Sequence, residues 1–277
     1  MAIPPYQEEK NMSQHIQPSL ELLKNYFDKI YVVSIERTRQ HRLEKVKENL
    51  NGVDFEFFEG TDATLLSKEE LNEIADLPRS ATFLDEFFMM RYGHKANRPL
   101  HKSEIGCSYS HVRIYQEMLE KNYQRVLIFE DDAKIDSRYI NLIPVILSEI
   151  PKDCELLYWG YRWFDSESNL RRWIRILFQS PLRILISKMA GKKNLNSDQR
   201  YPSPYKEHIW NSGLHAGTHA YSITKKGAAK MLKVNFPVVM NADQAITYLH
   251  QKNEMKCYVT VPLIFRDDQS VPTSLNV

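Results

Sequence analysis

Three consecutive carboxylates, Glu130, Asp131 and Asp132, directly follow the apolar run 125–129 (RVLIF). Such a run predicts a buried strand, and residues that follow a strand in an open α/β sheet face the crevice in which these sheets bind ligands. Because side chains alternate along an extended chain, Glu130 and Asp132 are expected to point the same way and to hold one Mg²⁺ or Mn²⁺ ion. Asp131 is then expected to turn toward the sheet or toward a ligand. A solvated acidic turn is the alternative interpretation.

Four further residues are of types that do chemistry at such an edge. His219 lies in a predicted strand, where it is either another metal ligand or a hydrogen-bonded core histidine. Asp243 opens a predicted helix, so it is either the helix N-cap or a general base. Glu104 occupies the first turn of another helix, where the helix dipole favours a carboxylate, and it is the second candidate for a base. His111 follows on the next turns of that helix and is expected to reach the same cleft.

Small residues separate Glu104 from His111 on this helix. Gly106 has no side chain and therefore allows another backbone to approach the helix closely. Because small residues are common in protein cores, we predict that Gly106, Cys107 and Ser110 are packing residues.

Hydrophobic periodicity predicts the elements that would bring these residues together. Strand, helix and strand follow one another over 29–58, an order typical of the parallel, doubly wound sheet of nucleotide-binding folds. A leading helix over 19–27 makes residues 1–28 an N-terminal helical extension, with the main domain over 29–277. Residues 64–100 show little periodicity and are predicted to be an irregular connection with a helix near 67–75. The predicted strands are 29–35, 54–58, 125–129, 156–160, 217–223 and 256–265, and the other predicted helices are 39–50, 103–121, 225–232 and 243–250.

The composition is that of an ordinary globular protein. The 277 residues are 43% hydrophobic and 26% charged, which excludes a disordered or membrane-embedded chain. The formal net charge of +2 gives no support for a nucleic-acid partner. Three cysteines without CxxC spacing favour a reducing compartment, and the first residues lack the basic and apolar parts of a secretory signal. We therefore expect a cytoplasmic protein that binds no nucleic acid.

The strongest local charge lies in residues 170–193, which include seven basic residues and no acidic one. Apolar residues recur there at helical spacing, and the segment belongs to a predicted helical insertion over about 165–210. A basic amphipathic segment of this kind fits an anionic membrane surface. The alternative is a helical hairpin that packs on the domain.

Residues 101–111 (HKSEIGCSYSH) and 127–133 (LIFEDDA) together resemble the signature of glycosyltransferase family 25. This family comprises lipopolysaccharide-type galactosyltransferases and relatives that glycosylate collagen. The resemblance continues through 157–160, 217–224, Gly227-Ala228 and Asp243. It implies a GT-A-like nucleotide-sugar fold with a mostly parallel central sheet, a UDP-galactose donor, inversion at the anomeric carbon and a divalent metal at the acidic motif.

The resemblance also implies roles for the candidate residues. Inverting transfer needs a carboxylate that removes a proton from the acceptor hydroxyl, for which Asp243 and then Glu104 are the candidates. Glu130, Asp132 and His219 would hold Mn²⁺ or Mg²⁺. The nucleotide-sugar contacts that we expect are Ser34, Arg37, Arg42, Asp131 and His111.

Two departures from the family pattern qualify this hypothesis. Ser34-Ile35 replaces the usual Asn-Leu after the first strand, which puts a uridine contact in doubt, and the segment over 162–211 is longer than the family needs. The hypothesis is a metal-dependent transferase that acts on a lipopolysaccharide or lipooligosaccharide, at the inner face of a bacterial inner membrane. The alternatives are a catalytically inactive, carbohydrate-binding relative and a metal-dependent phosphoesterase. The sequence offers no second ligand cluster of the kind that a two-metal phosphoesterase requires.

Overall fold

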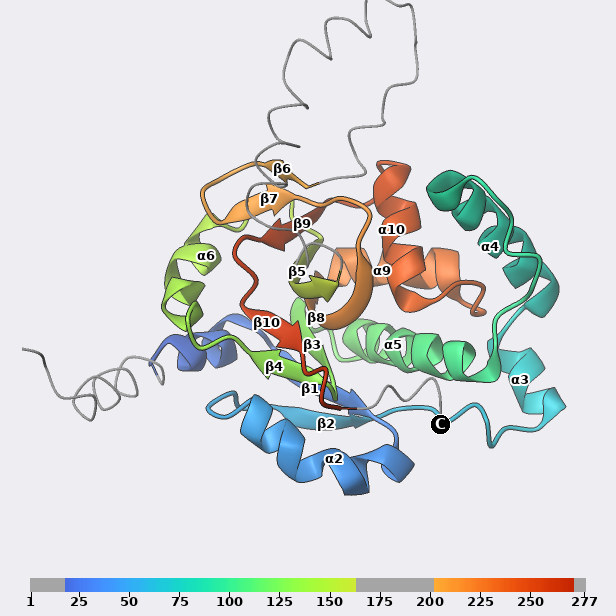
Figure 1. The fold of residues 1–277 in the computed structure, drawn as a ribbon, viewed down its shortest axis with the longest axis horizontal. Coiled ribbons are helices and arrows are strands. Elements are labelled where there is room, and N and C mark those ends of the chain that lie inside the picture. The colour runs from blue at the N-terminus through green and yellow to red at the C-terminus, as the bar shows by residue number, and fades with distance from the viewer. Residues whose placement is uncertain (1–17, 163–201, 272–277) are drawn as a thin grey trace, which may run out of the picture.

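A computed structural model describes residues 18–162 and 202–271 as an α/β fold built on an eight-stranded sheet (Figure 1). Its strands are β1 (Lys29–Ser34), β2 (Glu56–Glu59), β3 (Arg125–Glu130), β5 (Leu156–Arg162), β6 (Ser203–Pro204), β7 (Ile209–Asn211), β8 (Ala216–Thr224) and β9 (Cys257–Thr260). They are ordered β2-β1-β3-β8-β5-β9-β7-β6. β8 runs antiparallel to both β3 and β5, and β7 runs antiparallel to β9 and β6. The other six strands of this sheet run in one direction, which confirms the α/β class and the mostly parallel sheet.

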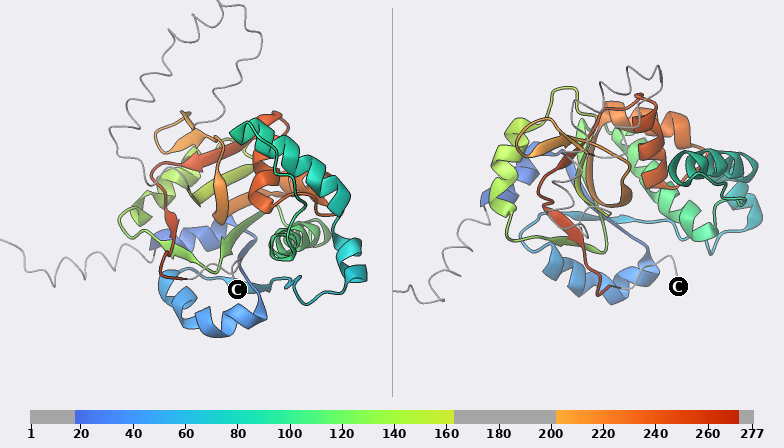
Figure 2. Two further views of the ribbon diagram at one scale, coloured as in Figure 1. Left: turned by 45° about the vertical axis from the view of Figure 1, so that its right-hand side comes forward. Right: turned by 45° about the horizontal axis from the view of Figure 1, so that its top comes forward.

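Helices cover both faces of this sheet (Figures 1 and 2). They are a segment at 18–26, α2 (Glu36–Asn49), α3 (Lys68–Ile74), α4 (Leu77–Tyr92), α5 (Lys102–Glu120), the short η1 (Ile140–Leu142), α6 (Ile143–Glu149), α9 (Lys225–Asn235) and α10 (Ala242–Gln251). Successive residues of a strand point to opposite faces, so a buried strand supplies two cores. In β3, Val126 and Ile128 cluster with residues of α5, α9 and α10. Leu127 and Phe129 cluster instead with α2, α6 and the helix at 18–26.

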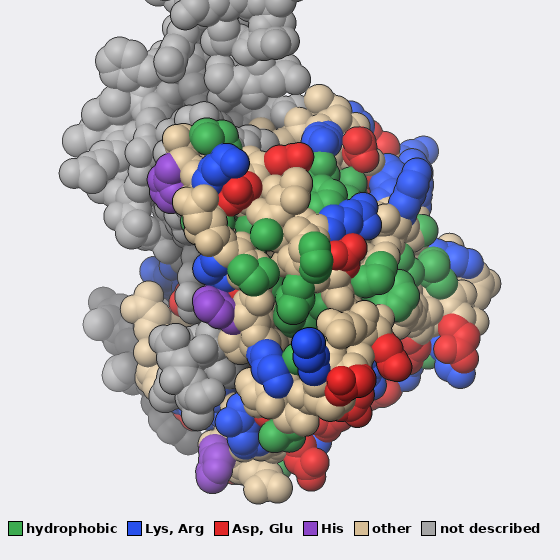
Figure 3. Space-filling model, turned by 90° about the vertical axis from the view of Figure 1, so that its right-hand side faces the viewer, with side chains coloured by type: hydrophobic (Ala, Val, Ile, Leu, Met, Phe, Trp, Pro, Cys, Tyr) green, Lys and Arg blue, Asp and Glu red, His purple; other side chains and the backbone are tan. Residues whose placement is uncertain are grey.

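The predicted irregular connection over 64–100 is wrong in its second half, where α4 forms. The Asp76 side chain caps α4 by accepting a hydrogen bond from the backbone N–H of Arg79 (3.0 Å), and the helix ends at Gly93, whose φ is +79°. Leu84 buries the inner face of α4 against α5. The outer face that carries α3 and α4 has hydrophobic side chains interspersed with charges of both signs (Figure 3).

The strand predicted over 256–265 is two strands in the structure. β9 ends at Thr260, and Pro262 lies between it and β10 (Phe265–Asp267), which leaves the main sheet and pairs antiparallel with β4 (Ala133–Ile135). Proline has no N–H to donate to a ladder, so an uninterrupted central strand is disfavoured at this position. β6 and β7 were not predicted from the sequence. α2 begins three residues earlier than predicted, at Glu36.

Asp136 joins the ends of the small sheet. Arg138 Nε donates to its Oδ1 at 2.8 Å and Arg266 Nε donates to its Oδ2 at 2.7 Å. The hydrogen bonds from Arg138, followed by the one from Arg266, lower the pKa of Asp136 to about 2, although burial opposes the shift. The ionised carboxylate thus ties β10 to the turn after β4.

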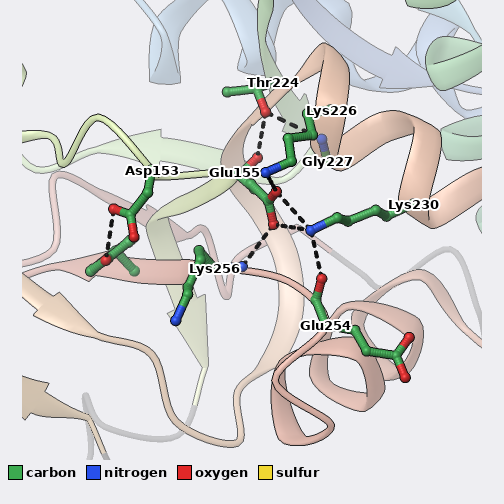
Figure 4. Close-up of polar contacts among 9 residues, drawn as sticks. Asp153, Glu155, Thr224, Lys226, Gly227, Lys230, Glu254 and Lys256 are labelled. Atoms are coloured by element: carbon green, nitrogen blue, oxygen red, sulfur yellow. Dashed lines mark hydrogen bonds and ion pairs between the residues drawn. The ribbon is translucent and has the colours of Figure 1, made fainter.

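A second buried carboxylate, Glu155, ties the start of β5 to α9 (Figure 4). Lys230 Nζ donates to both of its oxygens, at 2.6 and 2.7 Å, and Lys226 Nζ lies 2.8 Å from Oε1. The backbone N–H of Lys256 donates to Oε2 at 3.0 Å. Burial opposes ionisation of Glu155, but the lysine side chains and the backbone bond hold its pKa below the ordinary value.

The basic segment 170–193 lies outside the described residues, as does most of the predicted insertion over 165–210. None of the helices in the described ranges is long and apolar enough to cross a membrane. The helix at 18–26 buries Leu20 and Leu23 in the same cluster as Val32 of β1. This helix therefore contributes to the core of the main sheet.

Candidate active site

A cleft of about 380 Å³ opens where β1 and β3 end, where the reversed strand β8 begins, and where α5 and α10 have their first turns. Such an edge, at the carboxyl ends of parallel strands, is where open α/β sheets bind ligands. The cleft is lined by all ten residues that the sequence nominated, namely Ser34, Arg37, Arg42, Glu104, His111, Glu130, Asp131, Asp132, His219 and Asp243. The structure therefore brings together residues that are up to 209 positions apart, and the role of each stays a prediction.

The predicted metal ligands form one cluster. Donor atoms of Glu130, Asp132 and His219 all lie within 4.8 Å of one another. The Thr218 hydroxyl donates a hydrogen bond to Glu130. Burial and the carboxylates of Asp132 and Asp243 raise the pKa of Glu130 above its ordinary value. A cation would relieve this repulsion, and because two carboxylates and an imidazole are suitable donors, the cluster fits a divalent ion.

Asp131 points away from this cluster, as the alternation of side chains predicts. Its Oδ2 accepts hydrogen bonds from Ser34 Oγ (2.8 Å) and Thr38 Oγ1 (3.3 Å), and its Oδ1 accepts one from Arg42 Nη1 (2.5 Å). Asp131 and Arg42 are each only 9% exposed. Arg42 is thus a buried arginine, although it lies on a helix at the surface of the domain. Ser34 and Arg42 hold the turn after β3 in place through Asp131. The contact to the nucleotide-sugar that we expected of Arg42 stays a prediction.

Arg37 lies at the rim of the cleft. Its side chain is 46% exposed, and Nη2 lies 3.1 Å from Asp62 Oδ2. A guanidinium on the rim, held by one carboxylate, still presents donors to an anion in the cleft. This position suits the predicted contact of Arg37 to the nucleotide-sugar, which stays a prediction.

Asp243 is not the N-cap of α10, because Asn241 occupies that position. It lies instead in the first helical turn, where its Oδ2 accepts a hydrogen bond from the backbone N–H of Gly217 (3.0 Å). Gly217 has φ +81°, and a Cβ there would lie 2.6 Å from Cε1 of His219. Glycine is therefore required at the start of β8, where the backbone bonds Asp243 and leaves room for the His219 ring.

Glu104 is fully engaged by its neighbours. It accepts two hydrogen bonds from Arg98, at 2.7 and 2.9 Å, one from the backbone N–H of His101 (2.7 Å) and one from Asn241 Nδ2 (3.3 Å). Burial opposes its ionisation, but the bonds from Arg98, His101 and Asn241 hold the pKa of Glu104 below the ordinary value. These bonds make Glu104 a weaker proton acceptor than an ordinary carboxylate and join the starts of α5 and α10.

His111 is 1% exposed, and its Nδ1 lies 2.8 Å from the Tyr221 hydroxyl. Burial lowers its pKa to about 4, so the imidazole is neutral near pH 7. Its Nε2 lies 3.9 Å from Glu130 Oε1. His111 therefore reaches the floor of the cleft behind the metal ligands.

The sequence prediction missed part of the cleft lining. Cys107, predicted to be a packing residue, is exposed in the cleft, and Thr38, Thr218 and Asn241 also line it. Gly106 does pack as predicted, since a Cβ on it would lie 2.5 Å from a backbone carbonyl oxygen of the loop after β2. Ser110 is buried as predicted but also borders the cleft. The i, i+4 spacing of Cys107 and His111 was the signal that would have placed the thiol in the cleft.

The fold and the site together define an α/β protein with a ligand cleft at the carboxyl edge of its sheet and a cluster of oxygen and nitrogen donors for a cation. Residues 27–246 match the model of glycosyltransferase family 25 (LPS biosynthesis protein), and the chain belongs to this family. The resemblance seen in the sequence motifs is thereby confirmed.

Individual relatives are distant. A glycosyltransferase 25 family member of Aedes aegypti is 27% identical over 58% of this chain and 25% of its own length. Procollagen galactosyltransferase 2 of Mus musculus is 26% identical over 48% of this chain and 21% of its own length. Inactive glycosyltransferase 25 family member 3 of Homo sapiens is 25% identical over 57% of this chain and 26% of its own length. The chain thus spans about a quarter of the length of these relatives. Among solved structures, mouse xyloside xylosyltransferase 1 in its apo form has a TM-score of 0.34 and 11% identity, covering 81% of this chain and 69% of that one.

Proposed function

We propose that this protein is a glycosyltransferase that moves a sugar from a nucleotide-sugar donor to a glycan acceptor. The observation that carries the proposal is the convergence of all ten nominated residues on one cleft, around a cluster of donors suited to a cation. Membership of glycosyltransferase family 25 supports it. We further propose that the donor is UDP-galactose, in keeping with the galactosyltransferases among the relatives.

Glu130, Asp132 and His219 are the residues that would hold Mn²⁺ or Mg²⁺. The ion would supply positive charge to the diphosphate of the donor as it leaves. Arg37 would add a guanidinium from the rim of the cleft. The turn that carries the metal ligands would be fixed by the hydrogen bonds that Ser34 and Arg42 donate to Asp131. These three residues would support the metal site without binding the ion.

Asp243 is the better-placed general base of the two candidates. It lines the cleft, and the hydrogen bond from the Gly217 N–H to Oδ2 orients its carboxylate. Removal of the proton from an acceptor hydroxyl by this group would allow direct attack on the anomeric carbon and inversion of its configuration. The carboxylate oxygens of Glu104 already accept hydrogen bonds from Arg98, His101 and Asn241. Its proposed role is therefore to hold the first turns of α5 and α10 together beside the cleft.

The acceptor that we propose is a lipopolysaccharide or lipooligosaccharide, because the family is described as one of LPS biosynthesis proteins. A lipid-linked acceptor also suits the basic segment 170–193, which we propose docks on the anionic inner face of a bacterial inner membrane. Sedimentation with anionic vesicles at low salt tests the docking. Absence of binding, or binding that survives replacement of Arg171, Arg172, Arg175 and Arg183 by glutamate, would contradict it.

The activity is tested by incubating the purified protein with Mn²⁺ and each of several UDP-sugars, and by measuring the release of UDP. We expect release with UDP-galactose, loss of release with a chelator and recovery on addition of Mn²⁺. Two parallel reactions, with lipooligosaccharide and with a procollagen peptide, identify the acceptor by mass spectrometry of the product. A galactosylated peptide with unchanged lipooligosaccharide would contradict the proposed acceptor.

A second candidate function is carbohydrate or nucleotide binding without catalysis. The observation that favours it is the similarity to a human relative described as inactive. UDP that stabilises the protein against heat in the presence of Mn²⁺, with no UDP released from any donor, would establish this alternative.

A further inference from the structure

A second group of donors lies on the floor of the cleft, beside the proposed manganese site. Cys107 Sγ, a ring nitrogen of His111 and a carboxylate oxygen of Glu130 all lie within 4.8 Å of one another. Cys107 and His111 are four residues apart on α5, so the helix places their side chains on the same face. Cys107 is exposed, which leaves the thiol accessible to an ion that enters the cleft.

The orientation of His111 is an independent sign of a ligand. Its Nδ1 faces the Tyr221 hydroxyl at 2.8 Å, and Tyr221 in turn contacts the hydroxyl of Tyr115 at 2.6 Å. In the described part of the chain His111 Nε2 is buried and has no hydrogen-bond partner, although it points toward Glu130 Oε1 at 3.9 Å. A buried nitrogen without a partner is costly in free energy, and metal-binding histidines are commonly fixed in this way through their other nitrogen.

We propose that Cys107, His111 and Glu130 form a second cation site, selective for Zn²⁺ and similar borderline-soft ions. A thiolate, an imidazole and a carboxylate are the donors that zinc prefers, whereas two carboxylates and an imidazole suit Mn²⁺ or Mg²⁺. Binding forms a bond between the metal and sulfur, and the thiol proton passes to solvent. The site would hold its ion without any contribution from Asp132 or His219.

Glu130 belongs to both donor groups, and this makes the two sites compete. An ion held by Cys107 and His111 would draw Glu130 away from Asp132 and His219 and would add positive charge beside their cluster. Zn²⁺ is therefore expected to inhibit the manganese-dependent reaction. This consequence rests on the proposed function, but the existence of the zinc site does not.

Binding is tested first without any reaction, with Co²⁺ as a spectroscopic substitute for Zn²⁺. A thiolate bound to Co²⁺ gives a charge-transfer band in the near ultraviolet, which we expect in the wild-type protein and which Zn²⁺ should displace. Cys107→Ser should lose the band, and Cys154→Ser, which alters a thiol that does not line the cleft, should keep it. No band in the wild type, or a band that survives Cys107→Ser, would overturn the proposal.

Inhibition is tested next, in the UDP-release assay at fixed Mn²⁺. Loss of a group that only hydrogen-bonds to a metal ligand lowers metal affinity by about 10 to 100-fold. Loss of the sulfur ligand itself should therefore raise the Zn²⁺ concentration for half-inhibition by at least about tenfold. Cys107→Ser should leave the activity without Zn²⁺ unchanged, because the proposed reaction does not use the thiol. Equal inhibition of both proteins would overturn the competition. If neither protein releases UDP, the proposed function fails, while the cobalt band still decides whether the site exists.

Discussion

Replacement of Arg42 by methionine removes the cation that neutralises Asp131. Arg42 Nη1 and Asp131 Oδ1 lie 2.5 Å apart, and both residues are 9% exposed. Methionine keeps much of the volume of the arginine stem, and Asp131 keeps the hydroxyl bonds from Ser34 and Thr38. Loss of one partner from a buried ion pair typically costs about 3 to 5 kcal/mol. Because two hydroxyls remain, we expect a loss near the lower limit, about 3 kcal/mol in the free energy of unfolding.

The assay is urea denaturation, with thermal unfolding as a second measurement. A loss of about 3 kcal/mol corresponds to a fall of roughly 6 to 12 °C in Tm for a chain of this size. The matched control is Arg37→Met, which removes a half-exposed guanidinium at the rim of the same cleft. The Arg37 side chain is 46% exposed and its partner Asp62 is 12% exposed, so this pair is only partly desolvated and the control should lose less stability than Arg42→Met.

The double variant Arg42→Met/Asp131→Asn separates charge from packing. It removes both members of the pair, so no uncompensated carboxylate stays buried, and it should recover at least half of the lost stability. If Arg42→Met is as stable as Arg37→Met, or if the double variant recovers nothing, the reasoning about Asp131 is refuted.

The other predictions concern the metal ligands, the base, the helix contact and pH. Asp132→Ala should abolish the manganese-dependent thermal stabilisation by UDP; stabilisation equal to the wild type would remove Asp132 from the metal site. Asp243→Asn should lower turnover by about 10² to 10⁴ without weakening donor binding, and wild-type turnover would exclude it as the base. Gly106→Ala places a Cβ 2.5 Å from a backbone oxygen, and it should lower the free energy of unfolding by about 1 to 3 kcal/mol in urea. The pKa of Asp136 is lowered to about 2. Its contribution to stability, on the order of 2 kcal/mol, should therefore be present above about pH 4 and be lost as the pH falls toward 2. Asp136→Asn should flatten that part of the stability curve, and an unchanged curve would argue against the ion pairs.

The strands and helices of the central sheet were predictable because their apolar residues recur with a clear period. β1, β3 and α5 lie within a few residues of the predicted ranges. α4 was missed because its burial is distributed over scattered positions such as Leu84, although Asp76 and Gly93 marked its two ends. β6 and β7 are two and three residues long, which is too short for an alternating pattern.

The membership of the cleft was predictable, but the contacts inside it were not. A sequence shows that Arg42 and Asp131 have opposite charges, but not that they meet in the interior 89 positions apart. Likewise, the sequence does not show that Cys107 lies on the face of α5 that lines the cleft, because that depends on how the helix packs. Pairings between distant segments depend on tertiary packing, which local patterns do not encode.

The hydrogen-bond ladder between β3 and β8 sets the distance between the proposed metal ligands. The register pairs Ile128 with Tyr221 and Phe129 with Ala220, so the next pair along is Glu130 and His219. A one-residue insertion or deletion between His219 and the end of β8 at Thr224 would turn His219 to the opposite face of the sheet, even though every residue of the cleft would still be present. Length changes between β5 and β6 leave this register untouched, because β3 and β8 lie outside that segment. Natural variation in chain length is therefore expected to be tolerated between β5 and β6 and excluded from β8.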